Sequence, residues 1–181
     1  MDNFRVYAKY NDMDFDKRWK ELDKDEKLKQ QFWEEQDAWQ DAQPGVYFRN
    51  NVWWWRPLWN YVCKHCDDIL TEEDMTLGCE NSSHLINAEK ATKIGIELQS
   101  LLMSGATKEW KENYDKEVAE LPNEPCFRCN GNNHGHNKKK ECKPCNKTGE
   151  RDNWHASYPF DVENVERFSQ FCLQSGGFEI S

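Results

Sequence analysis

Apolar residues recur every three to four positions over much of this chain, and this spacing predicts amphipathic helices. In chain order the expected helices are residues 15–42, residues 57–66, residues 88–104, the segment between Gly105 and Pro122, and the segment between Asp161 and Gly176. Asn87 and Asp161 are typical caps at helix starts, and Gly105 and Gly176 suit the left-handed residue at a helix end. We expect the two helices that meet at Gly105 to form an antiparallel hairpin.

Alternating apolar and polar positions predict short strands at both ends of the chain. Phe4, Val6 and Ala8 alternate with more polar neighbours, and residues 46–49 form a second such run before the turn signal Asn50-Asn51. Residues 178–180 would complete a small sheet with these two strands. The pattern therefore predicts an α+β fold that is predominantly helical and contains a small mixed sheet.

Length and composition place the chain among soluble proteins. It has 181 residues, which is the length of one domain with a small appended module. Its longest apolar stretch, residues 52–55, is far shorter than the roughly 20 residues of a membrane-spanning helix. The first residues lack the charged-then-apolar pattern of a secretory signal, so we expect a cytoplasmic protein.

Charge is unevenly distributed along the chain. The net charge of −9 disfavours non-specific binding to nucleic acid phosphates. Residues 126–150 are a local exception, because they carry six basic residues and two acidic ones. A second exception is residues 44–62, which carry Arg49 and Arg56 and no acidic residue.

Two Cys-x-x-Cys pairs, Cys126/Cys129 and Cys142/Cys145, are separated by twelve residues. A two-residue spacer lets both sulfurs of a tight turn reach one ion at about 2.3 Å, and two such turns complete a tetrahedron. A reducing compartment favours metal over disulfides, although four thiolates also suit iron. We therefore predict a structural zinc site, with disulfides as the alternative. Few apolar residues lie between the cysteines, so the ion would take the place of a hydrophobic core.

This segment resembles the cysteine-rich zinc repeats of DnaJ-type chaperones, whose unit reads Cys-x-x-Cys-x-Gly-x-Gly. The first unit here keeps the first glycine, as Gly131, and the second unit keeps the second, as Gly149. The resemblance covers residues 126–149 alone, with two units where the family has four, and the chain has no His-Pro-Asp motif of a J-domain. It implies zinc geometry and partner binding but not chaperone activity. Residues 126–150 thus form an inserted zinc knuckle module, and residues 1–125 plus 151–181 form the helical core domain.

Cys63, Cys66, Cys79 and His84 offer a second zinc site. Their spacing, Cys-x2-Cys-x12-Cys-x4-His, is that of a small zinc finger. The alternative is that the cysteines are ordinary core residues and that His84 lies near a helix start. A second metal with an open position, beside His84 or His65, would permit hydrolysis.

Four tryptophans in seven positions make residues 53–59 the most unusual stretch. They cannot all face one way, so some belong to the core while others line a surface with Arg49 and Arg56. Residues 47–59 and 158–164 resemble a group of bacterial and phage proteins with no assigned function. That resemblance implies a bacterial or phage-encoded protein.

No phosphate-binding loop, His-Glu-x-x-His or Gly-x-Ser-x-Gly motif occurs in the chain. We therefore predict a zinc-stabilised, non-enzymatic protein-interaction protein of an accessory or inhibitor-like kind. The candidate contact residues are Arg49, Trp53, Trp54, Trp55, Arg56, Arg128, Lys138, Lys139 and Lys140. One alternative is nucleic acid binding through the basic residues of 128–147, and another is a metal-dependent hydrolase.

Overall fold

The computed structural model describes residues 3–8, 26–80, 83–130 and 142–180. The helices in this part of the chain are α2 (Glu26–Asp41), α3 (Val52–His65), α4 (Glu72–Leu77), α5 (Ala88–Ser104), α6 (Ala106–Ala119) and α7 (Val162–Gln174), with a 3-10 turn η2 (Trp154–Ser157). The strands are β1 (Asn3–Ala8), β2 (Tyr47–Asn51), β3 (His84–Asn87), β4 (Glu124–Pro125), β5 (Glu150–Arg151) and β6 (Gly177–Ile180). None of the helices in these ranges is long and apolar enough to cross a bilayer.

The larger sheet has the strand order β2-β1-β6-β3. Val6 of β1 pairs with Phe48 of β2 on one side and with Ile180 of β6 on the other, and His84 of β3 also pairs with Ile180. The α+β class and the sheet formed by both ends of the chain are confirmed. We expected a mixed sheet, but every pairing in the described strands is antiparallel, and β3 adds a fourth strand that the sequence pattern did not predict.

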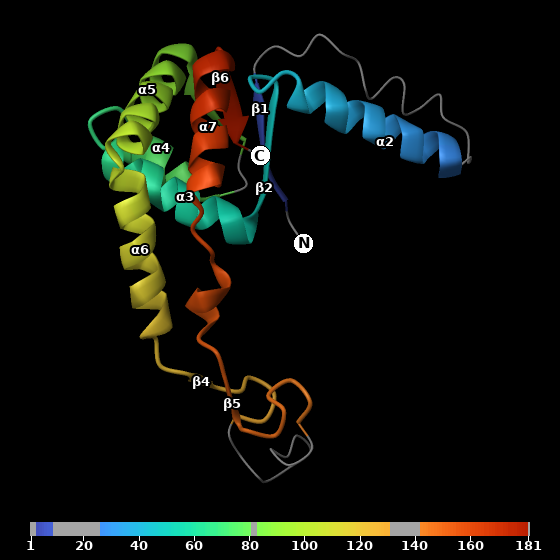
Figure 1. The fold of residues 1–181 in the computed structure, drawn as a ribbon, viewed down its shortest axis with the longest axis vertical. Helices are drawn as coiled ribbons and strands as arrows, with labels where there is room; N and C mark the ends of the chain where they lie inside the picture. Colours follow the sequence, from blue (N-terminus) through green and yellow to red (C-terminus); the bar gives the residue numbers. More distant parts are fainter. Residues whose placement is uncertain (1–2, 9–25, 81–82, 131–141, 181) are drawn as a thin grey trace.

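The hydrophobic core lies between one face of this sheet and helices α3, α5 and α7 (Figure 1). We call this part of the molecule, with α4, the body. Its largest fully buried side chains are Trp55, Trp59, Tyr61, Phe168, Phe171, Phe178, Leu58, Ile86, Ile94, Leu98 and Ile180. The helical spacing of apolar residues predicted Leu58, Trp59, Ile94, Leu98 and Phe168 on the inward faces of the three helices, whereas Trp55, Tyr61 and Phe171 are buried without belonging to a predicted stripe. Figure 1 shows α2 reaching outward from the sheet, on the side away from α5.

Helix α3 begins five residues earlier than the proline at its first turn would predict. The Asn51 side chain accepts hydrogen bonds from the backbone N–H groups of Trp53 and Trp54, at 3.0 and 3.2 Å, and so caps the helix. Pro57 therefore lies inside the helix. We interpreted Asn50-Asn51 as a turn. In the structure these two asparagines are the last residues of strand β2, and Asn51 is also the cap from which α3 begins.

Gly105 alone joins α5 to α6, with a left-handed φ of 83°. Asn87 caps the other end of α5 by accepting from the Lys90 N–H at 2.9 Å, as predicted. The predicted hairpin is wrong, because α6 continues away from the end of α5 instead of folding back beside it (Figure 1). A single left-handed residue ends one helix and starts the next but is too short for a reversal.

Helix α7 ends where the sequence predicts, before Gly176 and Gly177, whose φ values are 65° and 103°. Asp161 occupies the predicted cap position, but its side chain makes no capping hydrogen bond. The first predicted helix is confirmed over α2, and residues 15–25 lie outside the described residues.

Two segments extend from the body to the cysteine pairs, and together we call them the arm: α6 and residues 152–160. The Tyr114 hydroxyl on α6 donates to the Tyr158 carbonyl at 2.6 Å, and the Asn153 side chain donates to the Pro122 carbonyl at 3.2 Å. Figure 1 shows the arm ending at strands β4 and β5, far from the sheet. The described residues beyond it, 124–130 and 142–151, are called the Cys module below.

Candidate metal centre

Strands β4 and β5 bring the two Cys-x-x-Cys turns together. They pair antiparallel, with Glu124 opposite Arg151, and the Cys126 N–H then donates to the Gly149 carbonyl at 2.9 Å. Each turn closes with an asparagine directly after its second cysteine, and Asn130 and Asn146 both have a left-handed φ of 47°. Asparagine tolerates this conformation better than most residues, so the sequence supports the same turn twice.

The four sulfur atoms face one another at the spacing of a tetrahedral metal site. Sγ of Cys126 lies 3.6 Å from Sγ of Cys142, and Sγ of Cys129 lies 3.8 Å from Sγ of Cys145. All four sulfurs lie within 4.8 Å of one another. Four sulfurs placed about 2.3 Å from one ion at tetrahedral angles would be about 3.8 Å apart. The four cysteines could therefore hold a metal ion, and all eight cysteines of the chain are free of disulfides in the structure.

Backbone N–H groups favour the thiolate form of two of these cysteines. Hydrogen bonds from the backbone of Cys129 and Arg128 lower the pKa of Cys126. Burial raises the pKa of Cys145, but the Gly149 N–H, 3.4 Å from its sulfur, and the neighbouring thiols outweigh burial and lower that pKa to about 6. Burial raises the pKa of Cys142 to about 12. Because the thiolate is the form that binds metals, Cys126 and Cys145 are better prepared to bind an ion than Cys142.

The Cys module has almost no apolar interior. Its buried cluster consists of the four cysteines, whose exposed fractions are 0 to 5 %. Phe127, the only aromatic residue in the described part of the module, is 70 % exposed. The Arg151 guanidinium lies 5.1 Å from the centre of its ring, a cation–π distance, and pairs with Glu124 at 3.4 Å. With so little apolar burial, folding of the module would have to be stabilised by an ion bound to the four sulfurs.

The second predicted ligand set does not converge. Among the residues that the structure describes, the group at 126–145 is the only cluster of three or more possible metal ligands at binding distance. Cys63 and Cys66 lie at the end of α3, where burial raises the pKa of each to about 12 and disfavours the thiolate. His65 packs between the rings of Tyr61 and Trp110, at 4.5 and 5.4 Å. Neither histidine considered for hydrolysis therefore lies in a metal-ligand group.

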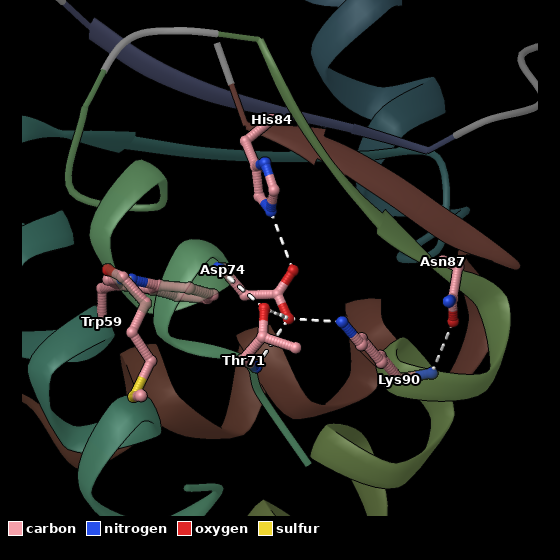
Figure 2. Close-up of polar contacts among 7 residues, drawn as sticks. Trp59, Thr71, Asp74, His84, Asn87 and Lys90 are labelled. Carbon is pink, nitrogen blue, oxygen red and sulfur yellow. Dashed lines mark hydrogen bonds and ion pairs between the residues drawn. The ribbon is translucent and has the colours of Figure 1, made fainter.

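His84 instead takes part in a polar cluster around Asp74, which Figure 2 shows in close-up. Nε2 of His84 lies 2.8 Å from Oδ1 of Asp74, while Lys90 and Thr71 donate to Oδ2. Asp74 is 4 % exposed, so these contacts offset the cost of burying its charge. The cluster joins three elements, because Asp74 and its cap Thr71 belong to α4, His84 to β3 and Lys90 to α5.

Hydrogen bonding sets the charge state of Asp74. Burial raises the pKa of this carboxyl, but the bonds from Lys90, from the Thr71 backbone and hydroxyl, and from His84 outweigh burial and hold the pKa well below its usual range. Our sequence reasoning missed Asp74 and Lys90. The available signal was Thr71-Glu72-Glu73-Asp74, a capping-box spacing in which the cap and the third helical residue bond each other, as they do here.

The aromatic stretch divides between core and surface. Trp55 is fully buried, stacks on Trp59 at 5.2 Å and donates through its indole N–H to the Gly78 carbonyl at 2.7 Å. Trp53 contacts Trp154, and Trp54 is 36 % exposed.

The remaining candidate contact residues are basic. Arg49, Arg56 and Arg128 are exposed. Lys138, Lys139 and Lys140 lie outside the described residues.

Comparison with known proteins gives no match. No family model matches the chain, and neither the curated proteins nor the solved structures contain a significant match. The metal centre therefore rests on the geometry of its own four sulfurs.

Proposed function

We propose that this protein is a zinc-stabilised, non-enzymatic interaction protein whose Cys module contacts a partner protein. The observation that carries the proposal is the set of four buried sulfurs at tetrahedral spacing, in a module that has no other buried cluster among its described residues. Four-thiolate zinc sites are closed and have no position for a substrate, so they serve structure. Four thiolates at tetrahedral spacing suit zinc or iron, and a purely structural role is the one that redox-inactive zinc fills.

The position of the Cys module supports a role in contact. The arm places it away from the body (Figure 1). It carries an exposed phenylalanine, Phe127, next to Arg128 in the sequence and beneath the Arg151 guanidinium. Aromatic and arginine side chains are enriched at the centres of protein interfaces. In this proposal Phe127 is the apolar anchor of the interface, and Arg128 and Arg151 flank it.

Metal content is the first test. Elemental analysis of the purified full chain should give about one zinc per chain, and Cys126→Ser should reduce it to near zero. Cys79→Ser is the matched control, because this cysteine is outside the site and half-buried, and it should keep the zinc. Zinc retained by Cys126→Ser, or lost from Cys79→Ser, would contradict the proposed site.

Partner contact is the second test. Crosslinking in cells of the native source, followed by mass spectrometry, should give a protein that is captured by the wild-type chain and lost with Phe127→Ala. Met103→Ala, which changes a side chain that is 84 % exposed on α5, should leave capture unchanged. Equal capture by all three chains would argue against the module as the contact surface.

Nucleic acid binding is a second candidate, favoured by the exposed cations of the Cys module. Arg128, Lys143 and Lys147 are all exposed. If these residues contact phosphates, affinity for an oligonucleotide should fall steeply with salt, and Lys143→Ala with Lys147→Ala should reduce the steepness by about two phosphate contacts. A salt-independent complex with one protein would support the first proposal instead.

A further inference from the structure

A cluster of aromatic rings and one arginine lies on the surface where the arm meets the body. Trp53 and Arg56 from the first turns of α3 contact Trp154 and Tyr158 of the arm, and Trp54, which follows Trp53 in the helix, is counted with them because its ring is exposed. We call this cluster the aromatic surface. It is separate from the Cys module, and the inference drawn from it goes beyond the function proposed above.

Three rings of the aromatic surface, those of Trp53, Trp154 and Tyr158, pack against one another. Trp53 lies 5.1 Å from Trp154 and 4.9 Å from Tyr158, and Trp154 lies 5.1 Å from Tyr158 with the ring planes at 83°. Arg56 donates to the Tyr158 hydroxyl at 3.0 Å, and its guanidinium lies 5.8 Å from that ring. A ligand would therefore meet rings already in position, which lowers the entropy cost of binding.

These rings are also accessible to a ligand. Trp154 is 39 % exposed and Trp54 is 36 % exposed, whereas Trp55 and Trp59 in the same helix are fully buried. Tyr158 itself is buried beneath them at 7 %. The core therefore uses two of the tryptophans of the stretch and leaves others at the surface, where a contiguous apolar patch is the kind of feature that marks a binding site.

Acidic residues are missing from the segments that build the aromatic surface. Residues 44–62 and 153–160 contain no aspartate or glutamate, although about five would be expected if the 33 acidic residues of the chain were spread evenly. The same segments contain Arg49, Arg56 and His155. In a chain of net charge −9, these segments offer cations and contain no acidic residue of their own.

We propose that the aromatic surface binds single-stranded nucleic acid. Each nucleotide carries two groups that complement this surface. Its flat base can stack on the tryptophans, and its phosphate can pair with Arg56. Stacking on exposed aromatic rings beside arginines is how proteins bind single strands without reading sequence. Bases within a duplex are already stacked on one another, so duplex DNA has no free base faces to stack on the tryptophan rings. An acidic protein segment offers the charge but not the repeated flat rings.

Fluorescence anisotropy of labelled dT20 and rU20 with the full zinc-loaded chain tests the proposal. Anisotropy should rise saturably at 50 mM salt with at least one of the two strands, which also tells DNA from RNA. Trp154→Ala should weaken binding about fivefold to a hundredfold, the range for one lost stack, while Trp154→Phe keeps most of the affinity. Arg56→Gln should lower the slope of affinity against salt by about one.

Matched variants distinguish binding at the aromatic surface from binding elsewhere on the chain. Trp33→Ala removes an equally exposed tryptophan on α2 and should bind like wild type. Trp54→Ala provides a second ring deletion if Trp154→Ala alters the arm, and zinc content shows that the Cys module is intact in each variant. No binding to either strand would overturn the proposal. So would unchanged binding by both ring deletions, loss of binding only with Lys143→Ala and Lys147→Ala, or binding of a glutamate–tyrosine copolymer in place of the strands.

Discussion

The body and the Cys module are stabilised in opposite ways. The body buries eleven large side chains almost completely, with aromatic rings packed edge to face and stacked across α3, α7 and the sheet. The buried cluster of the Cys module consists of four thiols, and the one aromatic ring in its described residues points to solvent. Burial of apolar surface can hold the first region together but not the second.

The comparison shows how the two regions should respond to perturbation. Removing an apolar side chain should affect the body and leave the sulfurs in place. Removing a ligand should affect the module and leave the body in place, because the β4–β5 pair and the arm separate the two (Figure 1). The following experiments test this independence, from the largest expected effect to the smallest.

Chelation should have the largest effect. Structural zinc binding contributes on the order of 10 kcal/mol to the folding of small zinc modules, so EDTA should unfold the Cys module and leave the body folded. In a two-dimensional NMR spectrum, backbone signals of Cys129 and Gly149 should move to unfolded positions while those of Ile94 and Phe168 remain. Added zinc should restore the original spectrum. A body that unfolds with the module would show that the two regions are coupled.

Trp55→Ala should have the largest effect on the body. It removes a fully buried indole that stacks on Trp59 and leaves the Gly78 carbonyl without its hydrogen bond. We expect the free energy of unfolding in urea to fall by about 3–5 kcal/mol, with zinc content unchanged. Trp33→Ala, in which a 45 % exposed indole is lost, is the matched control and should change stability little. Loss of zinc from Trp55→Ala would show that the Cys module is not independent of the body.

Asp74→Asn should lower the free energy of unfolding by less than Trp55→Ala, about 2 kcal/mol. The loss is smaller because the partners of Asp74, His84 and Lys90, are partly exposed to water. The folded-state pKa of Asp74 is depressed, so its stabilisation is complete above the unfolded-state pKa of about 4 and is lost as pH falls below that value toward the folded-state pKa. Urea unfolding between pH 6 and pH 3 should therefore show a steeper loss for wild type than for Asp74→Asn. Both chains should carry Cys126→Ser, so that zinc release does not contribute. Parallel pH profiles would contradict this role.

Gly105→Ala should have the smallest effect, about 1 kcal/mol. The φ of 83° at this position is strained for alanine, but an added Cβ would meet no atom within 4 Å. Thermal unfolding should show a small decrease in Tm, and Gly105→Asn a smaller one, since asparagine tolerates the left-handed region better. A large decrease would mean that the link between α5 and α6 carries packing that the structure does not show.

Local signals in the sequence predicted several features well. Asn87 and Gly105 defined α5 to the residue, and the two Cys-x-x-Cys pairs identified the four sulfurs that converge. Features that depend on distant parts of the chain were missed. The ring cluster forms only because Trp154 and Tyr158 return to α3 about one hundred residues later. The direction of α6 was missed for a local reason, because the sequence identified Gly105 as a helix end but not that it alone joins the two helices.

His84 shows why spacing alone did not identify a second metal site. Its position after Cys79 fits a zinc finger, but Asp74, ten residues before it, provides a buried carboxylate that binds the imidazole. The Cys/His spacing pattern does not include Asp74, which competes with a metal for the His84 imidazole. In the sequence, Asp74 can be recognised only by its capping-box position in α4. A ligand prediction therefore needs the nearby carboxylates as well as the spacing of the ligands.

Because Glu124 and Arg151 pair across β4 and β5, the inserted segment starts and finishes at neighbouring points in space. A cassette of this kind can be exchanged as a unit, since a short turn joining its two ends would restore the connection between α6 and η2. Its sequence is then free to change at a different rate from that of the scaffold. Related chains would be expected to vary most within this segment and least in the scaffold that carries it.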